Sequence, residues 1–215
     1  MTNNNTFIST HPLVAVKLSQ LRDKKLNAKE TRETLHDISL LLAYEATTNI
    51  IVSSETMGDG FLEPYKKTEI SQRVALVPIL RSGLGLVDAF LGLFPDAPVL
   101  HLGLYREKVS HQPVEYYNKI PENPNIDICY VLDPAVATSN TAVAAINILK
   151  ECGISGSQIV FVGVIGSKQG ITQLQDKHPD IRIHMAGIDD RLDENGYIRP
   201  GIGDTGDRLF STLYD

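Results

Sequence analysis

Four segments of this chain combine charged, hydrogen-bonding and glycine residues in patterns that could bind a phosphorylated ligand. The most informative is Asp133–Thr141, with the sequence DPAVATSNT. Residues 138–141 are small hydrogen-bonding residues at the start of an expected helix, where hydroxyls and free backbone N–H groups can hold a phosphate. Asp133 would repel a phosphate and suits sugar hydroxyls or a metal ion instead. A capped helix start beside a surface aspartate would give the same pattern.

The second segment is Pro78–Gly85, with the sequence PILRSGLG. Arg81 ends a strongly apolar stretch, which is a poor place for a charge unless an anion meets it. Gly83 and Gly85 would let a ligand approach the backbone at the following helix start. The segment could therefore bind a diphosphate, or Arg81 could simply pair with a carboxylate.

The third segment follows the next apolar stretch and has the sequence LYREK over residues 104–108. Arg106 and Lys108 could reach an anion, because the arginine fork matches phosphate geometry. The chain from here through Tyr117 is long enough to form a mobile flap. A solvated charge cluster on a hairpin is the alternative.

The fourth segment, Asn195–Asp207, has four glycines and one proline, so it cannot be a helix or a regular strand. Such a segment exposes main-chain N–H and C=O groups, which can bind the edge of a planar base. Tyr197 or Ile198 could then cover the face of the base. A turn-rich closing loop without a ligand is the alternative.

Other candidate groups carry less information. The acidic pairs Asp189–Asp190 and Asp193–Glu194 are interpreted as solvated loop charges, and no histidine has metal-ligand spacing. Cys129 and Cys152 have no CxxC spacing, so we expect two buried, unpaired thiols and a reducing, cytoplasmic setting.

The elements that would position these segments alternate along the chain. Apolar runs over 74–80, 98–105, 126–132, 158–165 and 181–188 predict buried strands, and the segments 84–94, 141–152 and 169–178 between them predict helices. Two further helices are expected from Pro12 and from the capping pair Asn27 and Glu30. This alternation predicts a doubly wound α/β fold, in which ligands bind at the carboxyl ends of the strands.

Length and composition fit one globular domain over residues 1–215. The chain is 42% hydrophobic and carries a net charge of −6, which argues against a nucleic acid or an anionic membrane as partner. The first residues, MTNNNTFIST, do not resemble a signal peptide. Residues 1–11 are interpreted as a polar arm, and 53–72 as a loop that could contain a hairpin.

Together the four segments resemble uracil phosphoribosyltransferases, enzymes of pyrimidine salvage. The markers are VPILRSGLG, LGLYRE, VLDPAVAT and GYIRPGIGDTGDR, in that order, and the resemblance extends from HPLV to GDRLF. It implies a type I phosphoribosyltransferase fold, α/β with a mostly parallel sheet and helices on both faces. It also implies a flap hairpin over 105–120 and a C-terminal uracil-binding region over 188–215.

The resemblance implies transfer of the 5-phosphoribosyl group from its 1-diphosphate to uracil, giving UMP and diphosphate. Mg²⁺ would be required without a metal site built from protein ligands. The resemblance also implies a homodimer or homotetramer and regulation by a nucleotide such as GTP. A non-catalytic nucleotide-binding regulator and an enzyme for another base remain as alternatives.

Together with the residue argument above, the resemblance assigns three sets of residues. The catalytic set is Asp133, Arg81 and Asp204. The donor would contact Arg81, Arg106, Asp133, Pro134, Ala135, Val136, Ala137, Thr138, Ser139, Asn140, Thr141 and Asp204. Uracil would contact Tyr197, Ile198, Gly203, Asp204 and Thr205.

One loop departs from the pattern it resembles. The family usually reads DPMLATGGS, so Ser139 and Asn140 stand where two glycines are common. If the backbone here is right-handed, both side chains add hydrogen bonds to the phosphate. If it needs a positive φ, Ser139 is strained. The run of hydroxyl residues favours the first outcome, in which replacing both residues by glycine weakens donor binding.

Overall fold

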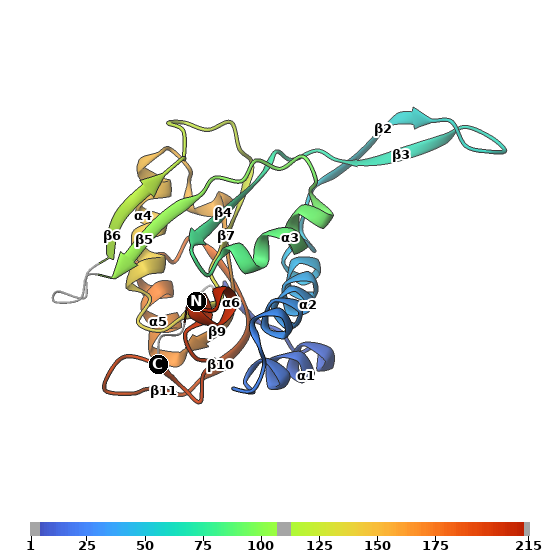
Figure 1. Ribbon diagram of the computed structural model, residues 1–215. Helices are drawn as coiled ribbons and strands as arrows, with labels where there is room; N and C mark the ends of the chain where they lie inside the picture. The colour runs from blue at the N-terminus through green and yellow to red at the C-terminus, as the bar shows by residue number, and fades with distance from the viewer. Residues whose placement is uncertain (1–4, 107–112, 213–215) are drawn as a thin grey trace.

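A twisted, mostly parallel sheet runs through the middle of the protein in the computed structural model, which describes residues 5–106 and 113–212 (Figure 1). The helices are α1 (Pro12–Leu21), α2 (Ala28–Ala46), α3 (Leu84–Leu93), α4 (Asn140–Glu151), α5 (Lys168–Lys177) and α6 (Thr205–Phe210). The sheet strands are β1 (Thr6–Ile8), β4 (Val74–Leu80), β5 (Leu102–Arg106), β6 (Pro113–Asn118), β7 (Ile128–Leu132), β8 (Ala135–Val136), β9 (Ile159–Ser167) and β10 (Arg182–Asp189). Two hairpins lie outside this sheet, β2 (Val52–Gly58) with β3 (Tyr65–Ile70) and β11 (Arg191–Leu192) with β12 (Ile198–Arg199).

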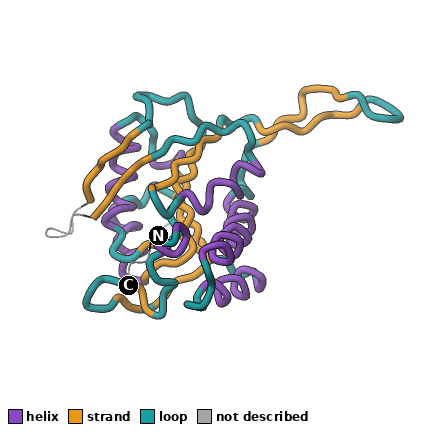
Figure 2. Tube along the Cα trace, in the orientation of Figure 1, coloured by secondary structure: helices purple, strands orange, loops and turns teal. Residues whose placement is uncertain are grey.

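The strand order is β1-β10-β9-β7-β4-β5-β6, with β8 paired to β9. Every neighbouring pair is parallel except β5 and β6, which form an antiparallel hairpin at one edge. Helices lie on both sides of the strands (Figure 2). The predicted α/β fold is confirmed, and so is the hairpin expected after the second apolar strand.

Alternate residues of the central strands face two separate cores. Leu76 of β4 and Tyr130 of β7 pack with α1, α2 and α3 on one side of the sheet. Val77 and Val131 pack with α4 and α5 on the other side. Because both faces are covered, these strands are apolar at nearly every position, which is the pattern that identified them in the sequence.

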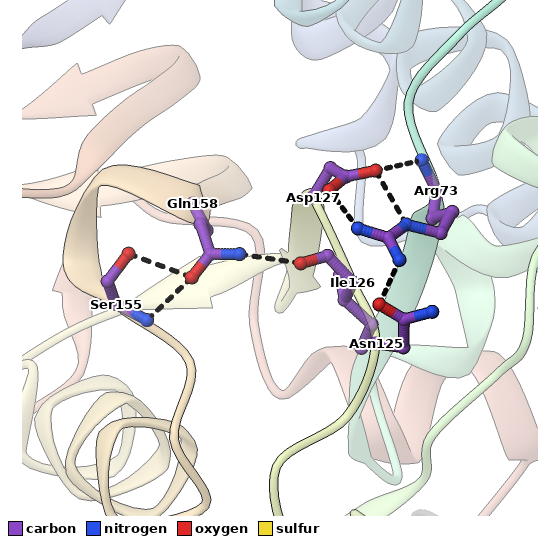
Figure 3. A network of polar contacts seen from close by, with 6 residues as sticks. All are labelled: Arg73, Asn125, Ile126, Asp127, Ser155 and Gln158. Carbon is purple, nitrogen blue, oxygen red and sulfur yellow. Dashed lines mark hydrogen bonds and ion pairs between the residues drawn. The ribbon is translucent and has the colours of Figure 1, made fainter.

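The amino ends of the central strands are held by a polar network (Figure 3). The Arg73 guanidinium donates to the Asp127 carboxylate, with Nε 2.8 Å from Oδ2, and also contacts the Asn125 side-chain oxygen. Gln158, just before β9, donates to the Ile126 carbonyl at 2.6 Å. The network therefore fixes the starts of β4, β7 and β9 at the edge of the sheet opposite their carboxyl ends.

One segment differs from the sequence interpretation, and one hairpin that the sequence left open is confirmed. Residues 6–8, interpreted as part of a polar arm, form the edge strand β1, with Thr6 opposite Ile183 of β10. A three-residue strand is too short to show a period of its own, and pairing with β10 forms it. The 53–72 segment is a long hairpin, β2 and β3, that projects from the body as an arm (Figure 1).

Candidate active site

A cavity of about 550 Å³ lies at the carboxyl ends of the central strands. Four segments surround it: the turn after β4, strand β5, the loop after β7 and the chain from residue 195 to 206. Its lining residues are Ile79, Leu80, Ser82, Leu104, Asp133, Ala135, Ala137, Thr141, Ile165, Asn195, Gly196, Tyr197, Ile198, Ile202, Gly203, Asp204, Thr205 and Gly206. Nine residues of the predicted site are among them, in the place expected for a doubly wound sheet.

Asp133 is the buried acid of this cavity, with 7% of its surface exposed. It follows β7 directly, and its Oδ1 accepts a hydrogen bond from the Ser82 hydroxyl at 3.1 Å. Burial raises the pKa of Asp133 to about 7, against the lowering effect of the bonds from Ser82 and the Ala135 backbone. No cation is paired with this carboxylate among the described residues, so it is suited to accept hydrogen bonds from hydroxyls or to face a positive charge.

The residues after Asp133 divide between the cavity wall and the scaffold behind it. Ala135 lines the cavity, while Val136 of the same short strand β8 is buried in the core. The Pro134 carbonyl accepts from the backbone of β9, and the Ala137 carbonyl accepts from Ser167 at 2.6 Å. These bonds fix the path of the loop, so Pro134 and Val136 support the site from behind.

The favoured expectation of a right-handed backbone at Ser139 is wrong. Ser139 is the N-cap of α4 with φ 60° and ψ −3°, the left-handed conformation that glycine adopts most easily. Its side chain is buried, and its hydroxyl has no partner among the described residues. Asn140 accepts a hydrogen bond from Gln173 of α5 at 3.1 Å. The Ser139 side chain is buried and the Asn140 side chain contacts α5, so neither residue is in the cavity lining.

Arg81 pairs with a carboxylate, as one of the two sequence interpretations held. Its guanidinium lies 2.9 Å from Asp207 Oδ1 and 3.0 Å from Thr212 Oγ1. The Arg81 side chain is half exposed, with a relative exposure of 50%. An ion pair this exposed stabilises by only ~0–1 kcal/mol, so an incoming anion can displace Asp207 at little cost.

The third predicted segment is described only in part. Arg106 is the last residue of β5 and pairs with Pro113 of β6, so its backbone lies in the predicted flap hairpin. Glu107 and Lys108, and the Arg106 side chain, fall outside the described parts of the structure. The contact predicted between Arg106 and a phosphate therefore stays a prediction.

The predicted base-binding segment forms one wall of the cavity. Tyr197, Ile198, Gly203, Asp204 and Thr205 all line it. Asp204 caps α6, with its Oδ1 accepting from the Asp207 N–H at 2.9 Å. The segment bends through glycines with positive φ at 196, 201 and 203. The prediction that it contains no helix or regular strand is wrong at two places, because Ile198–Arg199 pairs as the short strand β12 and α6 begins at Thr205.

Two acidic residues interpreted as solvated are structural. Asp189 is buried, and its carboxylate accepts from Arg22 and from the Gly201 N–H. Asp193 accepts from the Tyr197 N–H at 2.9 Å and from Arg199 Nε at 2.8 Å. The sequence shows acidic residues in a loop, but only the fold brings the loop's own N–H groups onto them. Their neighbours at 190 and 194 are exposed, as expected.

Sequence reasoning missed two polar residues of this region. Ser82 lies inside the segment already singled out and donates to Asp133, so a search for partners of the buried acid could have found it. Arg22 ends a helix 167 positions away from Asp189 and gave no signal. The two cysteines are free as predicted, although only Cys129 is buried.

The described residues contain no cluster of three or more His, Cys, Asp or Glu side chains that could hold a metal by themselves. Asp133 and Asp204 are the carboxylates of the cavity wall. One or two carboxylates suit Mg²⁺ when a substrate supplies phosphate oxygens. Within the same described parts of the chain, no helix is long and apolar enough to cross a membrane.

The chain has the fold of the type I phosphoribosyltransferases. The AQ2163 protein of Aquifex aeolicus superposes with a TM-score of 0.88 at 31% identity, over 97% of this chain and 100% of that one. An adenine phosphoribosyltransferase from Trypanosoma brucei gives a TM-score of 0.55 at 10% identity, over 89% and 87% of the two chains, which is a likeness of fold alone.

The sequence identifies the family within this class. Residues 8–212 match the family described as uracil phosphoribosyltransferase. The chain is 49% identical to the uracil phosphoribosyltransferase of Roseiflexus castenholzii over 96% of its length and 98% of the relative's. It is 41% identical to that of Streptococcus thermophilus, over 95% and 97%. The chain belongs to the uracil phosphoribosyltransferase family.

Proposed function

We propose that this protein transfers the 5-phosphoribosyl group from 5-phosphoribosyl 1-diphosphate to uracil, forming UMP and diphosphate. The observation that carries the proposal is a single cavity with two different walls. One wall has the buried Asp133 and the start of α4, which suit a phosphorylated sugar. The other is the glycine-rich segment ending at Thr205, which suits a planar base. A ribosyl donor and a base would meet between them.

The residues act by position and charge rather than by covalent catalysis. As the bond between ribose C1 and the diphosphate oxygen breaks, diphosphate leaves with the electron pair and C1 gains positive charge. Uracil N1 forms the new bond to C1 and gives up its proton. Asp133 would accept from the ribose hydroxyls and stabilise the charge at the ribose, and Arg81 would release Asp207 to bind the leaving diphosphate.

We propose Mg²⁺ as the cofactor; the carboxylates of Asp133 and Asp204 are the cavity residues that would help to hold it when the donor supplies phosphate oxygens. When bound, it would neutralise negative charge on the leaving diphosphate. The burial of Asp133 beside the cavity, with no cation paired to its carboxylate among the described residues, supports this role. The β5–β6 hairpin would exclude water from the donor.

The test is diphosphate release and UMP formation from the donor with each free base in turn. Uracil should react, with Mg²⁺ required. Cytosine should react poorly, because its amino group and unprotonated N3 would leave buried main-chain groups unpaired, at ~1–3 kcal/mol each. Comparable turnover of cytosine would contradict the proposed role of the base-binding wall. Donor binding without UMP formation would favour a non-catalytic regulator.

We further propose that the protein is a homodimer or homotetramer that works in the cytoplasm. Large apolar side chains exposed on the β2–β3 arm support self-association, above all Phe61 and Leu62, whose exposures are 110% and 100%. The free thiols Cys129 and Cys152 support a reducing compartment. Regulation by GTP stays a prediction of the family resemblance.

A further inference from the structure

A part-buried ion pair joins the end of α1 to the base-binding wall. Arg22, just after α1, donates from Nη1 to Asp189 Oδ2 at 2.8 Å and from Nη2 to Oδ1 at 2.7 Å. Asp189 ends β10 and is 8% exposed. Both oxygens of the carboxylate and two nitrogens of the guanidinium are engaged, the geometry that makes arginine–carboxylate pairs strong and directional. α1 and β10 lie against each other, so the pair is anchored on both sides (Figure 1).

This ion pair holds both main-chain polar groups of Gly201. The Gly201 N–H donates to Asp189 Oδ2 at 2.8 Å, and the Gly201 carbonyl accepts from Arg22 Nη1 at 2.9 Å. Gly201 has φ +65°, and a Cβ there would lie 2.2 Å from the Ile198 carbonyl oxygen. Two hydrogen bonds and the lack of room for a side chain therefore fix the backbone at Gly201, which directly precedes residues of the cavity lining.

A second arginine, Arg208, attaches the next residue of the base-binding wall to the end of α1. Arg208 Nη1 donates to the Ile202 carbonyl at 2.6 Å and to the Leu21 carbonyl at 2.7 Å, and its Nη2 donates to the Asp23 carbonyl at 2.9 Å. The Gly203 main chain, next along the wall, has no hydrogen-bond partner within the described part of the chain. The main-chain groups of Gly203, which line the cavity, thus follow directly after the residues that are attached to α1.

We propose that Arg22 and Asp189 are positioning residues for the base, which hold the 201–203 main chain in the conformation that binds uracil without touching either substrate. The inference rests on the proposed function for the identity of the base. Neither residue lines the cavity, and both lie against the base-binding wall rather than the Asp133–Thr141 loop. Their loss should therefore weaken binding of the base and leave binding of the phosphoribosyl donor unchanged.

The charge of Asp189 is essential to this role. Burial raises its pKa, but the bonds from Arg22 and Gly201 outweigh burial, and the net pKa is lowered, so the carboxylate stays ionised near neutral pH. An asparagine has nearly the same shape. Its NH₂ group, however, cannot accept a hydrogen bond, and one of the donors that now meet Asp189 would lose its partner.

The experiment compares Asp189→Asn and Arg22→Met with a matched control pair, Asp127→Asn and Arg73→Met. Arg73 and Asp127 also form a two-nitrogen ion pair, but at the opposite edge of the sheet (Figure 3). For each variant, KM for uracil, KM for the donor, kcat and melting temperature are measured. Amide hydrogen exchange of residues 198–206 is followed by mass spectrometry, a readout that needs no turnover.

We expect Asp189→Asn and Arg22→Met to raise KM for uracil about tenfold or more, with KM for the donor within about twofold of wild type. Exchange over 198–206 should accelerate. The control variants should lower the melting temperature and leave both KM values and that exchange unchanged. The inference is overturned if KM for uracil stays within about twofold in the Asp189 and Arg22 variants, or if both KM values rise together in all four variants.

The proposed function fails separately from this inference. If wild-type protein makes no UMP from uracil, the proposed function is wrong. Hydrogen exchange then decides the inference alone. Unchanged exchange over 198–206 in Asp189→Asn refutes it. Faster exchange over 198–206 in Asp189→Asn but not in Asp127→Asn supports the conclusion that Asp189 holds the base-binding wall in place.

Discussion

At the scale of single residues, Asp133 is a buried carboxyl whose ionisation costs stability. Burial raises its pKa from 3.8 to about 7, so the folded protein holds this proton more tightly than the unfolded chain does. The stabilising contribution is therefore complete at pH values below the unfolded pKa and is lost as pH rises through about 7. Above that pH the ligand-free protein carries an unpaired buried charge.

We predict that Asp133→Asn removes this cost and also removes activity. The melting temperature of the variant minus that of wild type should increase from pH 5 to pH 8, because only wild type acquires the buried charge in that range. Turnover should fall by the equivalent of ~2–4 kcal/mol of transition-state stabilisation. Calorimetry at several pH values, with steady-state kinetics beside it, tests both parts. A difference that is flat or falling with pH would show that the carboxylate is already ionised in the folded protein.

Ser139 gives a second prediction at this scale. A left-handed serine costs ~1 kcal/mol relative to glycine, and its buried hydroxyl lacks a partner in the described structure. Ser139→Gly should therefore raise the free energy of unfolding by ~1–2 kcal/mol, measured by urea denaturation. Donor binding should not weaken, in contrast to the expectation from the sequence.

Ser139→Ala is the control for this change, because alanine removes the hydroxyl and keeps the strained Cβ. It should gain less stability than glycine. Equal gains would assign the whole effect to the hydroxyl, and a loss of stability with glycine would mean that the left-handed backbone carries no strain here.

At the scale of elements, the turn from β4 into α3 needs a residue without a side chain. A Cβ on Gly83 would lie 2.3 Å from the Leu132 carbonyl oxygen and 2.7 Å from the Ile79 backbone N. The contact brings the Ser82 turn against the end of β7, which is how Ser82 reaches Asp133. The glycine therefore sets the geometry of the buried acid.

We predict opposite effects for two alanine substitutions in this region. Gly83→Ala should destabilise the protein by ~2–4 kcal/mol, because backbone atoms must move. Gly92→Ala, in α3 with nothing within 4 Å of the new methyl group, should stabilise it by up to ~1 kcal/mol. Chemical denaturation measures both. Similar effects at the two positions would mean that the turn can open without cost.

At the scale of the whole molecule, the β2–β3 arm is an outlier. It projects from the body (Figure 1), and among the described strands β2 and β3 pair only with each other. An isolated two-stranded hairpin is marginally stable in water. The exposed Phe61 and Leu62 at its tip are the apolar surface that would contact another subunit in the proposed oligomer.

We predict that Phe61→Ser with Leu62→Ser weakens self-association, measured by sedimentation velocity over a range of concentrations. Glu63→Ser, a change at the same tip that keeps both apolar side chains, is the control and should leave the distribution unchanged. If wild-type protein is a monomer at every concentration, or if the double variant associates as wild type does, the arm is not an interface.

The sheet and the position of the candidate cavity could be predicted from the sequence alone. Strands such as β4 and β9 are covered on both faces, so their positions are apolar throughout, and this pattern can be read without a structure. Asp133, Tyr197 and Thr205 were identified because they follow such strands or lie in a glycine-rich segment, and the parallel topology then brings strand ends together.

Tertiary structure alone decided which polar groups meet. Whether Ser139 faces a ligand depends on one backbone torsion, which residue types bias but do not fix. The role of Asp189 depends on Arg22, 167 positions away, and on the bend at Gly201 that presents an N–H to it. Hydrophobic burial is repeated along an element and leaves a period in the sequence. A hydrogen bond between distant loops involves single residues at unrelated positions, so it leaves none.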